Sequence, residues 1–246
     1  MRLAIIIPAY NEEKTIAQVI KTLPRKFPHI NYREIIVIND GSQDKTEAIA
    51  QKMPVTVISH YLNRGLGAAL GTGFEYVRRG KFDCLVTFDA DGQHNPNDIW
   101  SVIKPIINKK ADIVIGSRLK TASKKTNPRR HARLASKALR VGMPWYRIIG
   151  IWGLNIFTLV FYWVWTTDSQ SGLRAFSSRA IEKIKIISNK MEVSSEFFNE
   201  IQKHNLKLIE VPITPIYTSY SLTKGQKNSN GFKILSRIIY RRFIAK

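Results

Sequence analysis

Residues 83–94 have the sequence D-C-L-V-T-F-D-A-D-G-Q-H, in which an apolar run leads directly into two carboxylates, Asp89 and Asp91. The apolar run predicts a buried strand. Because one residue separates the two carboxylates, both can face one divalent cation at the strand's end. Oxygen ligands of this kind suit Mg²⁺ or Mn²⁺, which also bridges diphosphate oxygens. Gly92 permits the turn and Gln93 can add a neutral oxygen; an ordinary surface loop is the alternative.

The rest of the first 118 residues alternates short apolar runs with segments of helical periodicity. The expected strands are Leu3–Pro8, Glu34–Asn39, Val55–Ser59, Asp83–Phe88 and Asp112–Gly116. The expected helices are Asn11–Thr22, Asp44–Met53, Gly67–Arg78 and Asn95–Asn108, the last with Pro96 in its first turn. This alternation indicates βαβ units, and therefore an α/β fold with a mostly parallel sheet flanked by helices. Ligands of such sheets bind beyond the carboxyl ends of the strands.

Two further polar segments follow the first and second expected strands. The segment Pro8-Ala-Tyr-Asn-Glu12 offers the ring of Tyr10 to stack on a base and the carboxylate of Glu12 to accept a base N–H. A helix cap with an acid in the first turn is the alternative. In residues 39–44, N-D-G-S-Q-D, Asp40 lies at a strand end, where it can bind ribose hydroxyls or a base edge. Turn chemistry is the alternative there, and we expect Asp40 to bind ligand while its neighbours build the turn.

Three polar sites at successive strand ends, in this order, resemble the family-2 glycosyltransferases. Further motifs extend the resemblance over nearly the whole chain, and several are similar to the branch of dolichyl-phosphate mannose synthases and polyprenyl-phosphate glycosyltransferases. They are Asn63-Arg-Gly-Leu-Gly-Ala68, Val114-Ile-Gly-Ser-Arg118, Asp168-Ser-Gln-Ser-Gly-Leu-Arg174, Glu196, and Glu210-Val-Pro-Ile213 with Tyr217. Asn39 departs from the family, which usually has Asp there, and Gly92 replaces a frequent Leu. The resemblance implies a GT-A fold, a Rossmann-like and mostly parallel sheet, here with a basic, amphipathic C-terminal region.

The resemblance also implies roles for individual residues. The positions that hold the nucleotide are matched by Pro8, Tyr10, Glu12, Asp40, Gly65 and Gly67. The metal and diphosphate site, with Mg²⁺ or Mn²⁺, is matched by Asp89, Asp91 and Gln93, and an arginine expected on phosphate by Arg174. We expect Asp89, Asp91 and Arg174 to carry the catalysis. The region that meets a lipid phosphate is matched by Arg118, Arg130, Arg133 and Ser136. For the three arginines, a solvated surface charge is the alternative.

Three more side chains are candidates for the site. Glu196 could face the sugar or lie on a helix surface, and Asp168 could position Arg174 or touch the acceptor. Lys224 could close over the diphosphate, by a weaker match to the family.

The expected reaction moves a hexose from a GDP- or UDP-sugar to a polyprenyl phosphate, with the inversion that the family implies. A sugar that leaves a nucleoside diphosphate builds negative charge on the leaving oxygens, which a metal and an arginine stabilise. A phosphate acceptor is already anionic and needs no strong general base. The motifs of processive synthases, Glu-Asp and Q-x-x-R-W, are missing, which favours a single transfer. A family-2 enzyme with a soluble or polysaccharide acceptor is the alternative, and a catalytically inactive membrane-binding relative is another.

The net charge of +21 is concentrated in two stretches without acidic residues. Residues 113–167 hold ten Lys and Arg, and residues 211–246 hold seven. Such a distribution indicates an anionic partner. No nucleic-acid-binding motif accompanies it, so an anionic membrane surface is expected and nucleic acid is not.

The expected organisation is a catalytic domain at residues 1–220 and a basic amphipathic tail at 221–246. Within the domain, residues 118–167 form an inserted basic loop and an apolar helix at Ile148–Trp165, which is borderline for the roughly 20 residues of a membrane span. We expect this helix to be buried or interfacial. With no secretory signal and with Cys84 as a single, buried thiol, the protein is expected in the cytoplasm, peripherally bound to the membrane.

Overall fold

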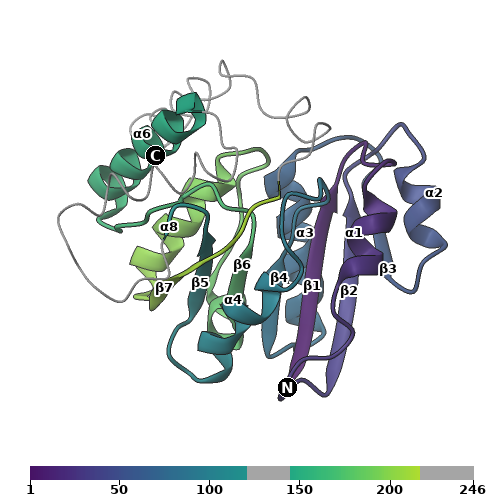
Figure 1. Cartoon of the computed structure of the whole chain (residues 1–246), viewed down its shortest axis with the longest axis horizontal. Helices are drawn as coiled ribbons and strands as arrows, with labels where there is room; N and C mark the ends of the chain where they lie inside the picture. The colour runs from purple at the N-terminus through teal and green to yellow at the C-terminus, as the bar shows by residue number, and fades with distance from the viewer. Residues whose placement is uncertain (121–144, 217–246) are drawn as a thin grey trace.

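The computed structural model describes residues 1–120 and 145–216, which fold around one seven-stranded sheet (Figure 1). The strands are β1 (Arg2–Ala9), β2 (Tyr32–Asn39), β3 (Thr56–Ser59), β4 (Cys84–Thr87), β5 (Ile113–Ser117), β6 (Arg174–Ser177) and β7 (Leu208–Pro212). Their order across the sheet is β3-β2-β1-β4-β6-β5-β7. The five expected strands all exist, with ends that differ by at most two residues.

Most strand pairs in this sheet are parallel, as expected for βαβ units. The exception is β6, which lies between β4 and β5 and runs antiparallel to both. Its first residue, Arg174, pairs with Thr87 on one side and with Ile115 on the other. An antiparallel strand begins at the edge where its parallel neighbours end. Arg174 therefore lies at the carboxyl ends of β4 and β5, although no strand was expected at this position.

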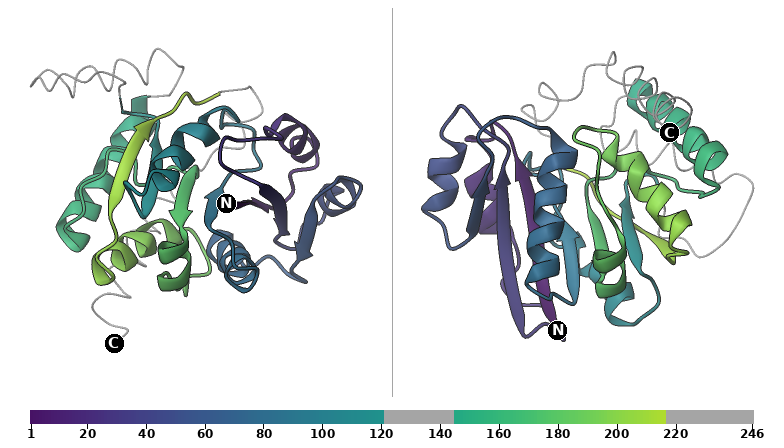
Figure 2. Two further views of the ribbon diagram at one scale, coloured as in Figure 1. Left: turned by 90° about the horizontal axis from the view of Figure 1, so that it is seen from below. Right: turned by 180° about the vertical axis from the view of Figure 1, so that it is seen from behind.

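Helices cover both faces of the sheet (Figures 1 and 2). One face packs against α1 (Ile16–Thr22), α2 (Thr46–Gln51) and α4 (Asp98–Ile107). The other packs against α3 (Leu66–Arg79), α7 (Ser178–Lys183) and α8 (Val193–Lys203). Side chains of β1 alternate between the two cores, with Ile5 in the first and Ile6 in the second. Burial on both faces explains why the strand sequences are continuously apolar.

Cys84 in β4 is fully buried, as expected. Burial, together with the nearby charge of Asp83, raises the pKa of this thiol to about 12. The thiol is therefore protonated and unreactive under ordinary conditions.

Three helices begin later in the structure than the sequence predicted, at Ile16, Thr46 and Asp98. Asn11 has a φ of 53° and the carbonyl of Glu12 accepts from the N–H groups of Thr15 and Ile16, so a turn precedes α1. Asp44 lies before α2, because its carboxylate accepts hydrogen bonds from the backbone N–H groups of Thr46 and Glu13. Pro96 likewise precedes α4 and is not in its first turn. Asn11 and Asp44 connect the loops that follow β1 and β2.

The apolar helix α6 (Trp145–Tyr162) packs on α8 with an unusual distribution of side chains. Its buried positions include the polar residues Asn155 and Thr158. A stripe at helical spacing on another face is apolar and exposed, at Ile156, Leu159 and Val160. The buried side of α6 therefore mixes apolar residues, Ile151 and Tyr162, with polar ones, and a second, apolar stripe is left exposed.

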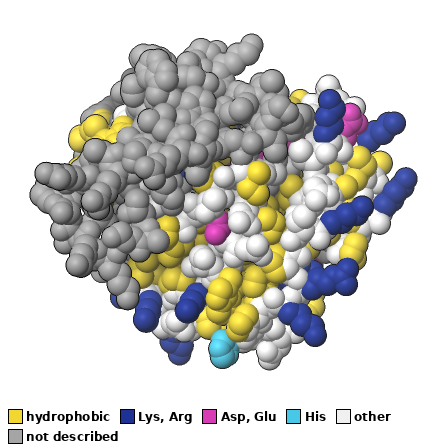
Figure 3. All heavy atoms as spheres, in the orientation of Figure 1, with side chains coloured by type: hydrophobic (Ala, Val, Ile, Leu, Met, Phe, Trp, Pro, Cys, Tyr) yellow, Lys and Arg dark blue, Asp and Glu magenta, His cyan; other side chains and the backbone are white. Residues whose placement is uncertain are grey.

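Within residues 1–120 and 145–216, no helix is long and apolar enough to cross a membrane. Figure 3 shows the molecule in the orientation of Figure 1 with its side chains as spheres. Lys and Arg side chains of the described residues lie along the lower and right-hand rim of this view, with few acidic side chains.

Candidate functional site

The site lies at the carboxyl edge of the sheet, where sequence analysis placed its polar groups. Glu12 follows β1, Asp89 and Asp91 follow β4, and Arg174 begins β6. Their charges influence one another. The charges of Asp89 and Glu12 affect the pKa of Asp91, and those of Arg118 and Arg174 affect the pKa of Asp89. The structure thus brings together the predicted metal site and two of the predicted phosphate-binding arginines.

Asp89 is held in place from two sides. Its carboxylate pairs with Nε2 of the buried His94 at 3.0 Å. On the other side it lies against Gly172, where a Cβ atom would overlap the carboxylate. Burial acts to raise the pKa of Asp89, but His94, Arg118 and Arg174 outweigh this effect and lower it. Asp89 is therefore a fixed, ionised carboxylate.

Asp91 is less well compensated than Asp89. One of its oxygens accepts a hydrogen bond from the backbone N–H of Gln93 at 2.9 Å, in a turn that Gly92 enters with a φ of 75°. Burial, followed by the charges of Asp89 and Glu12, raises the pKa of Asp91 to about 6. A carboxylate in this state gains from a cation placed beside it.

Arg174 is an almost fully buried guanidinium, 4% exposed. Its Nη2 donates to the carbonyl oxygen of Ser169 at 2.8 Å, and its Cζ lies 4.8 Å from the ring centre of Phe197. Burial lowers its pKa to about 10, against the opposing effect of Asp89 and Asp168, so it stays charged at neutral pH. Nε of Arg174 and the hydroxyl of Ser171 are buried and have no hydrogen-bond partner among the described residues.

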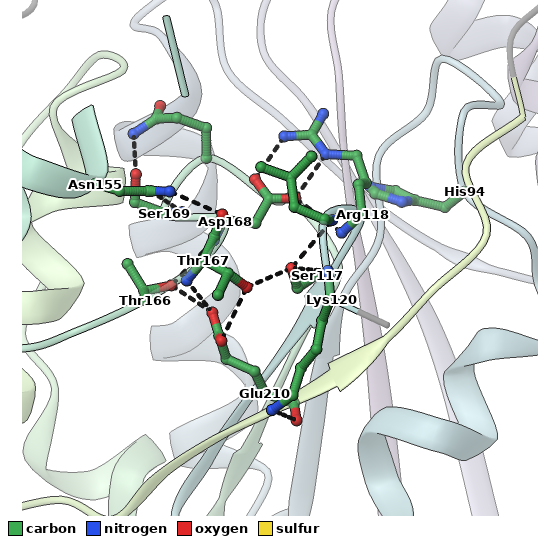
Figure 4. A network of polar contacts seen from close by, with 12 residues as sticks. His94, Ser117, Arg118, Lys120, Asn155, Thr166, Thr167, Asp168, Ser169 and Glu210 are labelled. Atoms are coloured by element: carbon green, nitrogen blue, oxygen red, sulfur yellow. Dashed lines mark hydrogen bonds and ion pairs between the residues drawn. The ribbon is translucent and has the colours of Figure 1, made fainter. Parts of the chain in front are cut away.

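Arg118 is paired with Asp168, which is fully buried (Figure 4). The guanidinium donates through Nε and Nη2 to the two carboxylate oxygens, both at 2.7 Å, and the backbone N–H of Arg118 adds a third bond. Asp168 was predicted to position Arg174 or to touch the acceptor. In the structure its carboxylate binds Arg118, and contact with the acceptor stays a prediction. Arg174 is held by the backbone of the next residue, Ser169.

The loop of residues 166–169, which carries these contacts, is itself anchored by three elements (Figure 4). Glu210 of β7 accepts from Thr166, and from both the N–H and the hydroxyl of Thr167. The hydroxyl of Ser117, at the end of β5, bonds to the Thr167 hydroxyl. Asn155 of α6 donates to the Thr167 carbonyl and accepts from the Ser169 N–H. Sequence analysis noted Glu210 and Ser117 only within motifs and assigned no role to Asn155.

Asp40, which was predicted to bind the nucleoside, already has protein partners in this structure. This carboxylate is buried and accepts from the backbone N–H groups of Arg64 and Gly65 at 3.0 and 2.7 Å, and it pairs with Nδ1 of His60 at 2.8 Å. These contacts hold the loop after β3 against the sheet. Tyr10, by contrast, is exposed, and Pro8 is partly exposed. The backbones of residues 10–12 and 40–44 are joined through Asn11 and Ser42.

The glycines of the N-x-G-x-G segment are in contact with protein. A Cβ atom at Gly67 would overlap the carbonyl oxygen of Ser188, and one at Gly65 would meet Asn189. The backbone N–H of Ser188 in turn donates to the carboxylate of Glu196 at 2.9 Å, and that of Ile187 donates to its other oxygen. Glu196 therefore fixes the loop that covers Gly65 and Gly67.

Several predicted residues lie outside the described part of the chain. They are Arg130, Arg133, Ser136, Tyr217, Lys224 and the tail at 221–246. Their roles stay predictions.

Comparison with known proteins agrees with this fold. The sequence profile of the family described as Glycosyl transferase family 2 matches residues 4–172. UDP-N-acetylglucosamine–dolichyl-phosphate N-acetylglucosaminyltransferase of Methanococcus voltae is 37% identical over 254 residues, covering 96% of this chain and 94% of that protein. Dolichol-phosphate mannosyltransferase of Pyrococcus furiosus is 29% identical over 222 residues, covering 87% of this chain and 56% of that protein.

A likeness in fold alone relates the chain to a more distant structure. Glucosyl-3-phosphoglycerate synthase of Mycobacterium tuberculosis, crystallised with Mn²⁺, UDP and phosphoglyceric acid, superposes with a TM-score of 0.67 at 16% identity. The match covers 99% of this chain and 79% of that one. The expected GT-A fold is thus confirmed. This chain belongs to glycosyl transferase family 2 and is a glycosyltransferase.

Proposed function

We propose that this protein transfers a hexose or N-acetylhexosamine from a nucleoside diphosphate sugar to a polyprenyl phosphate at a membrane surface. The observation that carries the proposal is the position of two buried or half-buried arginines, Arg118 and Arg174, beside the carboxylates Asp89 and Asp91 at one sheet edge. An edge with both kinds of charge suits a reaction between two phosphorylated substrates. The names of the relatives in Methanococcus voltae and Pyrococcus furiosus, which act on dolichyl phosphate, support this choice of acceptor.

The donor side of the proposal concerns Asp89 and Asp91. No group of three or more His, Cys, Asp or Glu side chains converges in a way that would cage a metal ion within residues 1–120 and 145–216. Two carboxylates, one of them with a raised pKa, fit a Mg²⁺ or Mn²⁺ ion whose other ligands are diphosphate oxygens and water. Such an ion, when bound, supplies charge stabilisation to the leaving diphosphate. The Mn²⁺ in the mycobacterial synthase is consistent with this use of the fold.

The chain's own groups then act on charge and on position. Arg174 offers a fixed guanidinium whose charge interacts with that of Asp89, and whose Nε has no hydrogen-bond partner among the described residues. In such a position it stabilises negative charge that develops on the leaving group. Asp168 holds the guanidinium of Arg118 in one orientation, so that this group needs little ordering when an anionic acceptor arrives.

The proposed reaction is a single displacement with inversion. A phosphate oxygen of the acceptor forms the new bond to the anomeric carbon while the bond from that carbon to the nucleoside diphosphate breaks. The nucleoside diphosphate leaves with the bonding electron pair. Because the acceptor oxygen is already anionic, no proton has to be removed in this step.

Membrane contact is proposed to involve the exposed apolar stripe of α6. Ile156 and Val160 are 52% and 61% exposed, and the neighbouring Trp163 is 82% exposed. Trp163 has a φ of 54°, a left-handed conformation that is costly for a large side chain. Apolar and tryptophan side chains at a surface suit the lipid interface, and the acid-free stretches 113–167 and 211–246 suit anionic headgroups. We infer a peripheral protein on the side of the membrane where nucleotide sugars are made.

A transfer assay with radiolabelled donors tests the proposal. Purified protein is incubated with polyprenyl phosphate in detergent, Mg²⁺ or Mn²⁺, and in turn GDP-mannose, UDP-glucose and UDP-N-acetylglucosamine. Label that enters the organic phase, and no longer does so with EDTA, would support the reaction and identify the sugar. Transfer only to a soluble acceptor, with no label in lipid from any donor, would disprove the polyprenyl phosphate assignment.

A further inference from the structure

Asn155 occupies an unexpected place, because its polar amide is buried on a helix that leaves an apolar stripe at Ile156, Leu159 and Val160 exposed. Its side chain is 3% exposed. Nδ2 donates to the carbonyl oxygen of Thr167 at 2.8 Å, and Oδ1 accepts from the backbone N–H of Ser169 at 3.0 Å. Both polar groups of one amide are therefore used to hold the loop of residues 166–169 against α6.

The segment that Asn155 holds is the one that positions both arginines of the site. Asp168, between the two bonded residues, binds the guanidinium of Arg118 through both carboxylate oxygens. The carbonyl oxygen of Ser169 accepts from Nη2 of Arg174. The path from α6 to the Arg118 guanidinium thus runs through Asn155, Ser169 and Asp168 (Figure 4). The path to the Arg174 guanidinium runs through Asn155 and Ser169.

The loop is anchored differently at its two ends. Thr166 and Thr167 are fastened to the sheet by Glu210 and Ser117. Toward Ser169 the loop is held from two sides, by Asn155 of α6 and by the contacts of Asp168 with Arg118 and of Ser169 with Arg174 on the sheet side. A shift of α6 relative to the sheet would change the bonds of Asn155 and, with them, the geometry of the arginine contacts.

We infer that Asn155 is a positioning residue, which couples contact between α6 and a lipid surface to the placement of Arg118 and Arg174. This inference rests on the proposed function, because it takes the exposed stripe at Ile156, Leu159 and Val160 as the lipid-facing side of the helix. Lipid on that side seats α6, Asn155 then fixes residues 167–169, and the two arginines are held for catalysis. The enzyme is consequently most active where its lipid acceptor is found.

Hydrogen exchange at single-amide resolution tests the coupling without any substrate. The Ser169 N–H reports the Asn155 bond, and the Thr167 N–H, held by Glu210, serves as an internal reference. Vesicles of phosphatidylcholine and phosphatidylglycerol should slow exchange of the Ser169 amide in the wild-type protein by about tenfold, and that of Thr167 much less. Wild-type protein that sediments with these vesicles but shows unchanged Ser169 exchange would overturn the inference, as would a failure to bind them.

Variants sharpen this test. Asn155→Leu keeps the size of the side chain and removes both bonds, so vesicles should no longer protect Ser169. Thr158→Val is the matched control, because Thr158 is also buried on α6 but its hydroxyl bonds within the helix, to the carbonyl of Leu154. This variant should respond to vesicles as the wild-type protein does. Equal protection in Asn155→Leu would rule out the coupling.

Kinetics separate this inference from the proposed function. With a short-chain, water-soluble isoprenyl phosphate as acceptor, acceptor-free vesicles should raise kcat of the wild-type protein and of Thr158→Val, and leave KM for the donor little changed. Asn155→Leu should lose about tenfold in kcat and most of the vesicle effect. Exchange that responds to vesicles without any transfer to polyprenyl phosphate would remove the proposed function and keep the coupling. Transfer to polyprenyl phosphate, with no effect of vesicles on kcat or on exchange of the Ser169 amide, would keep the proposed function and remove the coupling.

Discussion

Two carboxylates at the same edge of the sheet, Asp40 after β2 and Asp91 after β4, have opposite surroundings. Asp40 is surrounded by donors from the protein, namely two backbone N–H groups and His60. Asp91 accepts one backbone N–H and faces two other carboxylates, Asp89 and Glu12. The protein supplies hydrogen-bond donors for the Asp40 carboxylate, but it leaves the Asp91 carboxylate close to other negative charges. The surroundings of Asp40 are therefore built by internal contacts, whereas Asp91 would be compensated by a cation that binds beside it.

The largest effect is expected from Asp91→Asn in the transfer assay. Loss of one of two carboxylates at the proposed cation site should lower kcat by about a hundredfold to a thousandfold, while the protein stays folded. Asp98→Asn, on the nearby helix α4, is a suitable control for the loss of one negative charge outside the site. An Asp91→Asn enzyme with full activity would contradict the assignment of this residue.

The corresponding change at Asp40 should act on folding. Asn cannot accept from all three of the donors around Asp40, and a buried donor would be left unpaired. Asp40→Asn should therefore reduce the free energy of unfolding by roughly 2–4 kcal/mol, measured by urea denaturation. A variant with normal stability and a selective loss of nucleotide affinity would reverse the comparison and make Asp40 a ligand-binding residue.

The raised pKa of Asp91 predicts how its substitution affects stability without metal or substrate. The protonated form is favoured in the folded state, so this residue's stabilising contribution is complete below its unfolded pKa near 4. It is lost as the pH rises to the folded value of about 6. Above that pH, Asp91→Asn should be more stable than the wild-type protein by roughly 1–3 kcal/mol.

Thermal unfolding between pH 4 and pH 8 in EDTA checks this prediction. The difference between the two proteins should be near zero at the acid end and reach its full size just above pH 6. Added Mn²⁺ with a nucleoside diphosphate should stabilise only the wild-type protein. A constant difference across this pH range would exclude titration of Asp91 as its cause.

The smallest effect is expected on the surface of α6. Val160→Ser should weaken binding to anionic vesicles by about 1 kcal/mol, or several-fold in the partition coefficient measured by sedimentation. The matched control is Ile187→Ser, because Ile187 is 75% exposed but lies in the loop before α8. Equal weakening by both substitutions would indicate that α6 has no special part in membrane contact.

Local sequence patterns predicted the parallel part of the sheet and the carboxylates at its edge. This succeeded because an apolar run fixes a buried strand, and parallel strands end at a common edge. Asp89, Asp91 and Glu12 could therefore be brought together without knowing any long-range contact.

Other features could not be predicted because they depend on contacts between distant segments. The short strand β6 has no distinctive pattern, and its place between β4 and β5 arises from pairing with both. The partners of Arg118 and Ser169, Asp168 and Asn155, are 50 and 14 residues away in the chain. For Asp40, a strand-end position predicted ligand contact, but the fold supplies a histidine and two backbone donors first. Composition and spacing carry no information on such competition.

The insertion of β6 also has a consequence for biosynthesis. Strands β1 to β4 can pair as soon as they leave the ribosome, but the outer edge of β4 finds its partner only when residues 174–177 have been made. Until then, a strand whose residues are all buried in the folded protein, Cys84–Thr87, keeps an open edge, the kind of surface that pairs with other chains. The interval between residues 87 and 174 is thus the period in which the growing chain is most prone to aggregate. A chain interrupted within that interval would need a chaperone to stay in solution.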